Sequence, residues 1–160
     1  MKQTYRVIAG VIALGVLLEA AAIAFGWFDA ISEIDKGLVI DGNYEGNAGH
    51  MLHGIVGMYV MPLLGLSLLV VSFFAGVPGA RKWGGIVFGA ILIQVVLAIA
   101  AFSAPIIGAL HGINALVILG CAGRAAALTR GTLEARPSGE PGTVPSQRTE
   151  TSSTGSSLPA

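Results

Sequence analysis

Long apolar runs, separated by short polar segments, make up most of the chain. Four of them approach the ~20 residues that a helix needs to cross a bilayer, and they lie at about residues 7–28, 50–75, 83–102 and 106–123. The runs are continuously apolar, whereas the strands of a membrane barrel alternate between apolar and polar residues. The pattern therefore predicts an all-α integral membrane protein, a four-transmembrane-helix bundle that occupies residues 1–128.

Turn-forming residues between and within the runs refine this prediction. Gly76, Pro78 and Gly79 separate the second run from the third. The link at residues 103–104 is so short that the third and fourth helices must be antiparallel neighbours. Pro62 lies inside the second run, where its missing N–H is expected to kink the helix.

The composition supports the membrane prediction. Only 11% of the residues are charged, whereas soluble domains carry about 25%, and no basic patch suggests a nucleic-acid partner. Residues 129–160 differ, because Ser, Thr, Pro and Gly dominate there and large apolar residues are few. Such a segment cannot bury enough surface to offset its ordering entropy, so we expect a disordered cytoplasmic tail.

The basic residues predict the orientation in the membrane. All but one of them flank the runs on the same side: Lys2, Arg6, Arg81, Lys82, Arg124, Arg130, Arg136 and Arg148. The 29–49 loop on the other side holds Lys36 and five acidic residues. By the positive-inside rule we expect both termini in the cytoplasm and a multi-pass protein of the bacterial inner (cell) membrane. The competing interpretation, in which the first run is a signal peptide cleaved near residues 22–24, fits less well because the run is long.

An internal repeat divides the runs into two similar pairs. The tetrapeptide LHGI occurs at residues 52–55 and 110–113, inside the second and fourth runs. The first and third runs also correspond, since Glu19 begins EAAAIAF and Gln94 begins QVVLAIAAF. Both pairs start on the inner side, so we predict two helical hairpins that are parallel repeats about an axis along the membrane normal.

The repeat places its polar residues in two layers. His53 and His111 are expected about 7 to 9 Å from the outer ends of their helices, and Glu19, Gln94 and Asn114 at about 14 Å, given 1.5 Å per residue. Such residues usually face the interior of a bundle. Glu19 is then either a neutral acid hydrogen-bonded to Gln94 or Asn114 across the bundle, or part of a proton path.

Two matched histidines can hold one central atom from opposite sides. Haem iron is commonly held by histidine, and bundle interiors are common cofactor sites. Gly54 and Gly112, next to the two histidines, leave space for a flat macrocycle. We therefore hypothesise one b-type haem (haem b) between His53 and His111 near the outer face.

Other interpretations of the histidines stay open. His53 and His111 can be structural, hydrogen-bonded to carbonyls or to each other, with the glycines serving close helix packing. His50 shares a helix face with His53 and could bind zinc or copper together with His111 or with Asp41 or Glu45 of the loop. His50 could instead contact a haem propionate or shuttle protons.

Residues 5–126, with histidines near the outer ends of the second and fourth helices, resemble one half of haem A synthase. They also resemble small bacterial four-helix membrane proteins of unknown function, and cytochrome b561 is a second comparison. The resemblance implies that His53 and His111 ligate haem. In haem A synthase a glutamate precedes the helix-two histidine by three residues, and His50 occupies that place here. Cytochrome b561 carries two haems, one near each face, for which three histidines toward the outer side do not suffice.

No P-loop, nucleophile elbow or zincin signature is visible in the sequence, so enzymatic activity is left undecided. We expect haem binding for electron transfer, haem handling or redox sensing. The expected partners are the lipid bilayer and a quinone or a respiratory or haem-maturation subunit. The alternatives are a cofactor-free structural or accessory membrane protein and an outer-face zinc or copper site.

Overall fold

The computed structural model describes residues 1–130, and the tail expected at 129–160 falls almost wholly outside this part. Every regular element within residues 1–130 is helical. In chain order the elements are α1 (Lys2–Ile34), α2 (Ala48–Ile55), η1 (Val56–Val60), α3 (Met61–Ser72), α4 (Ala80–Ala101) and α5 (Ile107–Ala127). Because α2, η1 and α3 follow one another without a break, they form one span, Ala48–Ser72.

In the described part of the chain, four helices are long and apolar enough to cross a membrane: α1, the Ala48–Ser72 span, α4 and α5. This confirms the expectation of four apolar helices and suggests a multi-pass membrane protein. α1 is longer than the run at residues 7–28 that predicted it, because it continues to Ile34. Its 33 residues correspond to about 50 Å, well beyond a hydrocarbon core of ~30 Å.

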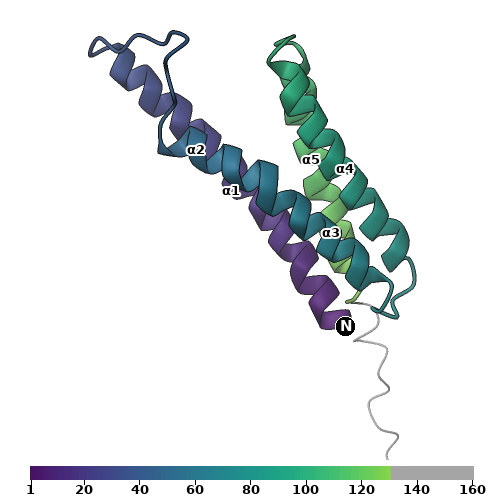
Figure 1. The fold of residues 1–160 in the computed structure, drawn as a ribbon. Helices are drawn as coiled ribbons and strands as arrows, with labels where there is room; N and C mark the ends of the chain where they lie inside the picture. The colour runs from purple at the N-terminus through teal and green to yellow at the C-terminus, as the bar shows by residue number, and fades with distance from the viewer. Residues whose placement is uncertain (131–160) are drawn as a thin grey trace, which may run out of the picture.

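Two antiparallel hairpins build the bundle (Figure 1). α1 pairs with the Ala48–Ser72 span, and α4 pairs with α5 as the short link at residues 103–104 predicted. α5 also packs along α1, and α3 packs along α4, whereas α2 packs chiefly on α1. As a result, the two hairpins lie close together at the end that holds the N-terminus and apart at the other end (Figure 1).

The Ala48–Ser72 span changes its hydrogen-bonding register just before Pro62. Val56–Val60 form a π-helical turn, in which the N–H of Met61 bonds to the carbonyl of Val56. Proline has no N–H to donate to the carbonyl four residues before it. A helix can accommodate such a break in its hydrogen bonds by a local π-helical turn. A widened turn therefore lies directly after the first LHGI segment, just before the proline at which a kink was expected.

Small residues let the helices approach one another closely, as is common in membrane bundles. In the tightest case, a Cβ added to Gly49 of α2 would lie 2.5 Å from the carbonyl oxygen of Ala22 and from the nitrogen of Gly26 on α1. At the other end of α1, the fully buried Tyr5 donates from its hydroxyl to the carbonyl of Ala80 at 3.1 Å. α1 is thus fixed against α2 near one end and against the start of α4 near the other.

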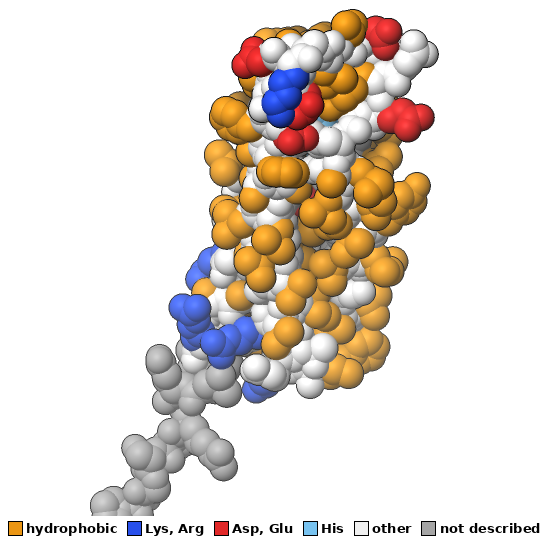
Figure 2. All heavy atoms as spheres, turned by 90° about the vertical axis from the view of Figure 1, so that its left-hand side faces the viewer, with side chains coloured by type: hydrophobic (Ala, Val, Ile, Leu, Met, Phe, Trp, Pro, Cys, Tyr) orange, Lys and Arg blue, Asp and Glu red, His pale blue; other side chains and the backbone are white. Residues whose placement is uncertain are grey.

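A wide band of hydrophobic side chains separates two charged ends of the molecule (Figure 2). Acidic residues and one lysine occupy the end that carries the 35–47 loop, and lysines and arginines gather at the opposite end. Large apolar side chains remain exposed within the band, among them Leu18 at 59% and Val96 at 64%. A surface of this kind fits contact with lipid and not with water.

Gly49→Ala tests the close contact between α1 and α2. The added methyl group would overlap the backbone of Ala22 and Gly26, and overpacking of this kind typically costs about 1–3 kcal/mol. We expect a lower unfolding temperature for the detergent-solubilised protein. Gly89→Ala is the matched control, because a Cβ there would meet nothing within 4 Å. Equal stability of the two variants would contradict the contact.

Candidate functional site

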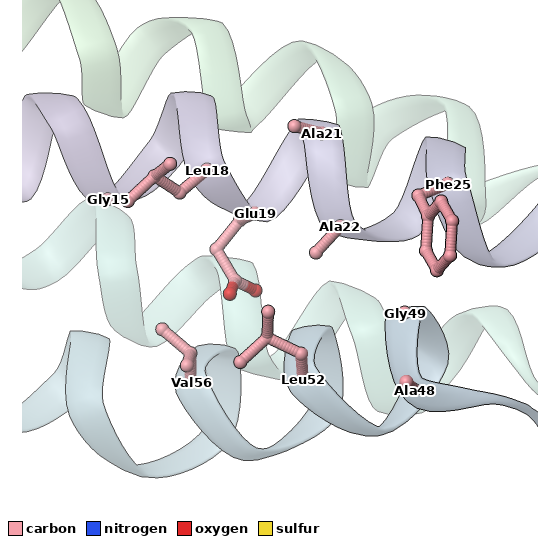
Figure 3. Close-up of a pocket in the computed structure, with 10 residues that line it drawn as sticks. All are labelled: Gly15, Leu18, Glu19, Ala21, Ala22, Phe25, Ala48, Gly49, Leu52 and Val56. Atoms are coloured by element: carbon pink, nitrogen blue, oxygen red, sulfur yellow. The ribbon is translucent and has the colours of Figure 1, made fainter.

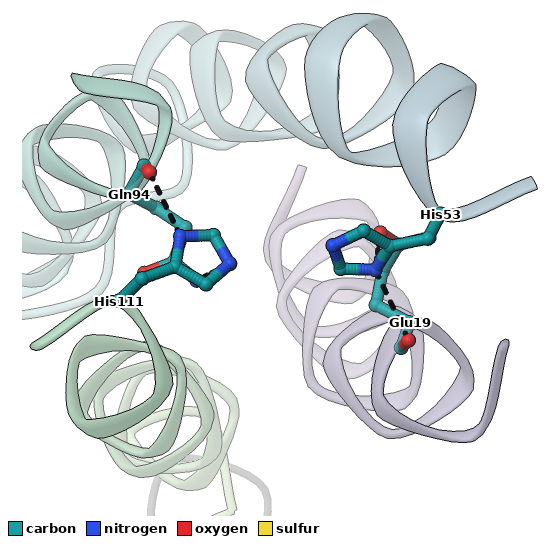
Figure 4. Close-up of polar contacts among 4 residues, drawn as sticks. All are labelled: Glu19, His53, Gln94 and His111. Atoms are coloured by element: carbon teal, nitrogen blue, oxygen red, sulfur yellow. Dashed lines mark hydrogen bonds and ion pairs between the residues drawn. The ribbon is translucent and has the colours of Figure 1, made fainter. Parts of the chain in front are cut away.

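The two LHGI histidines face each other between the hairpins. His53 on α2 and His111 on α5 have ring centres 6.2 Å apart, with their planes at 72° to each other. The two imidazoles point toward one another from opposite sides of the bundle (Figure 4). Both side chains are partly buried. They therefore lie at the same level of the bundle, one on each hairpin.

Each imidazole is anchored to the helix that pairs with its own. Nδ1 of His53 lies 3.1 Å from the carbonyl oxygen of Glu19, and Nδ1 of His111 lies 3.2 Å from the carbonyl oxygen of Gln94 (Figure 4). A carbonyl oxygen can only accept a hydrogen bond, so both contacts require the proton on Nδ1. The lone pair of each imidazole is then on Nε2, the atom left to bind a metal.

A closed network surrounds His111. The side-chain amide of Gln94 donates to Nε2 of His111 at 3.1 Å. Asn114 donates to the side-chain oxygen of Gln94 at 2.8 Å and to the carbonyl oxygen of Ala90 at 2.9 Å. The three side chains therefore satisfy one another. If His111 binds a metal through Nε2, the Gln94 amide must turn away from it.

Glu19 lacks such a network. Its Oε2 lies 3.0 Å from Nδ1 of His53, but the N–H is directed at the Glu19 carbonyl instead. Within residues 1–130, Oε2 has no hydrogen-bond partner. The bond expected from Glu19 to Gln94 or Asn114 is not made, because those two side chains pair with each other on α4 and α5.

The carboxyl group of Glu19 also lines an apolar groove between α1 and the α2–η1 segment (Figure 3). Leu18 belongs to the α1 side of the groove, and Leu52 and Val56 belong to the other side. Gly57 lies close to the carboxyl, since a Cβ there would be 3.0 Å from Oε2 of Glu19. The absence of a side chain at Gly57 therefore leaves room for the acid.

The arrangement of His53 and His111 fits the axial ligands of haem iron. Imidazole nitrogen binds metals at about 2 Å, so two imidazoles on one metal have ring centres roughly 6 Å apart, close to the distance found here. Cβ atoms added to Gly54 and Gly112 would meet nothing within 4 Å, so the positions beside both histidines are open.

His50 does not join this pair and instead belongs to the cap of α2. Asn47 accepts hydrogen bonds from the backbone N–H groups of Gly49 and His50, and Nδ1 of His50 lies 2.9 Å from Oδ1 of Asn47. Asn47 also donates to the carbonyl of Gly26 and to the carboxylate of Asp29, which ties α2 to α1. The sequence reasoning missed Asn47, although asparagine directly before a helix is a typical N-cap signal.

The zinc or copper alternative lacks a set of ligands in the described part of the chain. Within residues 1–130, no three His, Cys, Asp or Glu side chains lie close enough together to hold a metal ion. A haem needs fewer protein ligands, because the macrocycle occupies the other positions around the iron. The two opposed histidines therefore suit haem better than a bare metal ion.

No protein-family model, curated protein or solved structure matches this chain. The resemblance to one half of haem A synthase, and the comparison with cytochrome b561, accordingly gain no support from related proteins. What the structure shares with that resemblance is a set of four helices able to span a membrane.

The histidine tautomers can be tested by ¹⁵N NMR of histidine-labelled, haem-free protein in lipid. We expect His53 and His111 to carry the proton on Nδ1, because each Nδ1 faces a carbonyl oxygen. Gln94→Leu is the informative variant, since it removes the donor to Nε2 of His111 and keeps the carbonyl. The Nδ1–H tautomer should persist in Gln94→Leu, and an Nε2–H signal from either residue of the wild-type protein would contradict the anchoring.

Proposed function

We propose that this chain binds one b-type haem in the outer half of a four-helix membrane bundle, with His53 and His111 as the axial ligands. The observation that carries the proposal is the opposed pair of imidazoles, 6.2 Å apart, each with its Nδ1 bonded to a main-chain carbonyl. The open positions at Gly54 and Gly112 support it, because they leave space beside both ligands.

Groups of the chain itself prepare the two ligands. The carbonyls of Glu19 and Gln94 fix the rotation of the imidazoles and make their Nε2 atoms more basic. In the hydrocarbon of a membrane the access of water to the pair is limited, which tunes the redox potential of a metal centre. Haem, when bound, supplies one-electron chemistry, and the role that follows is electron transfer, haem handling or redox sensing.

We further propose that the protein resides in the inner (cell) membrane of a bacterium, with both termini in the cytoplasm. The concentration of lysine and arginine at the end that holds the N-terminus supports this orientation. The histidines then lie toward the outer face. One haem near one face cannot by itself carry electrons across the whole bilayer, so a quinone or a respiratory or haem-maturation subunit is the partner that we infer.

The reduced-minus-oxidised visible spectrum of protein purified in detergent, after expression with a haem precursor, tests the haem proposal. We expect sharp α and Soret bands in the wild-type protein. His53→Ala and His111→Ala should each abolish them, because each removes an axial ligand. Far-ultraviolet circular dichroism should show that both variants keep their helices.

His50→Gln is the matched control, since His50 lies on the same helix as His53 but belongs to the cap of α2. We expect it to keep its full haem content. A featureless spectrum from several folded wild-type preparations would overturn the proposal and favour a cofactor-free structural or accessory protein. Zinc or copper in elemental analysis, lost in His50→Gln, would instead favour the bare-metal alternative.

The orientation can be tested separately with single cysteines in a Cys121→Ser background. Lys36→Cys lies in the loop at the acidic end, and Lys82→Cys lies near the start of α4 at the basic end. A membrane-impermeant maleimide should label the first in intact spheroplasts and the second only after the membrane is opened. The reverse labelling pattern would contradict cytoplasmic termini.

A further inference from the structure

The two hairpins differ at the position three residues after the LHGI histidine. The residue at this position determines whether the side chain of Glu19 or of Gln94 has a hydrogen-bond partner. Asn114 follows the LHGI histidine of the second hairpin by three residues, and Val56 stands in the same place in the first hairpin. Asn114 donates to the side chain of Gln94, whereas Val56 has no polar group to offer Glu19. The first hairpin therefore buries a carboxyl group without the partner that the second hairpin provides.

The unpaired oxygen of Glu19 belongs to the groove between α1 and α2. Glu19 is only 9% exposed, and its Oε2 has no hydrogen-bond partner within residues 1–130. The groove is lined otherwise by apolar residues and glycine, and it opens to the outside of the bundle beside Leu18, Phe25 and Leu52, which are all more than half exposed. The carboxyl side chain of Glu19 thus lines an otherwise apolar groove that opens toward the lipid, and its Oε2 is buried there without a hydrogen-bond partner within residues 1–130 (Figure 3).

The depth of Glu19 limits what can reach it. Asp29, near the outer end of α1, follows Glu19 by ten residues, which corresponds to about 15 Å along the helix. This places the carboxyl deep in the outer half of a hydrocarbon core of ~30 Å, at the level of the His53 imidazole, whose Nδ1 lies 3.0 Å from Oε2. Phospholipid headgroups stay at the membrane surface, and their acyl chains carry no hydrogen-bond donor. The occupant must therefore dissolve in the membrane and carry its own donor to this depth.

We propose that the groove binds the ring of a membrane quinol, with a quinol hydroxyl donating a hydrogen bond to the carboxyl group of Glu19. A quinol combines hydroxyl donors and an apolar tail, which the depth of Glu19 requires, with a flat ring that can lie beside Phe25. The aromatic ring of Phe25 lies at the same groove and can pack against a flat ring.

Glu19 also connects this groove to the histidine pair, because its Oε2 lies 3.0 Å from Nδ1 of His53. A quinol bound there is next to the proposed haem ligand, and in that respect the inference rests on the proposed function and names its partner. The binding of the quinol itself depends on the groove and on Glu19, and it does not require haem.

Titration calorimetry with a decyl-substituted benzoquinol, on the full chain in lipid nanodiscs under anaerobic conditions, tests the inference. We expect saturable binding to the wild-type protein. Glu19→Leu keeps the approximate size of the side chain and removes the acceptor, so binding should weaken by about tenfold or more. Glu19→Leu should also unfold at a higher temperature than the wild type, because it removes an unpaired buried oxygen, and this shows that lost binding is not lost folding.

A pair of alanine variants tests the groove independently of the acid. Ala21 lines the groove, and its neighbour Ala20 is exposed on the same helix without lining it. Ala21→Phe should block quinol binding, and Ala20→Phe should leave it unchanged. Equal binding by the wild type, Glu19→Leu and Ala21→Phe would overturn the inference. Absence of saturable binding to the wild type, or equal competition by a short-chain phosphatidylcholine, would also overturn it.

The haem proposal and the quinol inference can fail separately. His111→Ala removes a proposed haem ligand on the opposite hairpin and leaves the groove intact, so it should still bind the quinol. A colourless wild-type protein that binds the quinol through Glu19 would leave the inference standing without the haem. A haem-containing protein whose quinol binding ignores Glu19 would overturn the inference alone.

Discussion

The half of this bundle that lies away from the N-terminus depends on a hydrogen bond from an imidazole Nδ1–H to a main-chain carbonyl of the paired helix. The bond occurs once in each hairpin, from His53 to Glu19 and from His111 to Gln94. In hydrocarbon a polar group must find its partner within the protein, because no water is present to replace it. A carbonyl already bonded within its own helix keeps a second lone pair, so the helix supplies this partner without losing a bond of its own. The same bond joins two helices and decides which nitrogen of the ring faces the space between the hairpins.

Different contacts close the two ends of the bundle, and this difference makes a site between the hairpins possible. Toward the N-terminus, Tyr5 of α1 bonds to the start of α4, and small residues such as Ala122 and Ala125 of α5 are fully buried. Toward the other end, Gly26 and Asn47 hold α1 and α2 to each other within one hairpin. Each hairpin is therefore fixed internally at that end, while the contacts between hairpins lie mainly at the other. A flat cofactor placed between the histidines would then separate two preformed surfaces and would not have to break a continuous core.

The sequence predicts some of these features well because they depend on composition and spacing alone. Four spans follow from the lengths of the apolar runs, and the facing histidines follow from two copies of LHGI at similar depths. The surroundings of Glu19 could not be predicted in this way, because they depend on how α1 is rotated about its axis relative to α2, α4 and α5. Spacing alone made Gln94 or Asn114 an equally good partner for the acid, yet those two side chains satisfy each other. The N-cap at Asn47 is different, because an asparagine directly before a helix is a signal that the sequence itself contains. It was overlooked in the sequence analysis.

The imperfect symmetry of the repeat is more informative than the symmetry itself. Where the second hairpin has Gln94 and Asn114, the first has Glu19 and Val56, so a neutral, fully bonded pair is replaced by an acid with one unpaired oxygen. An unpaired buried polar group costs about 1–3 kcal/mol, and a second copy of the closed network would avoid that cost with the residues that the other hairpin already uses. Residues that break a local rule of stability, such as a buried polar group without a partner, are concentrated at functional sites. The acid also lies between an apolar groove on the outside of the bundle and a histidine on the inside, a position that a purely structural carboxyl has no need to occupy. The asymmetry therefore points to the first hairpin as the side from which the proposed quinol would reach the histidines.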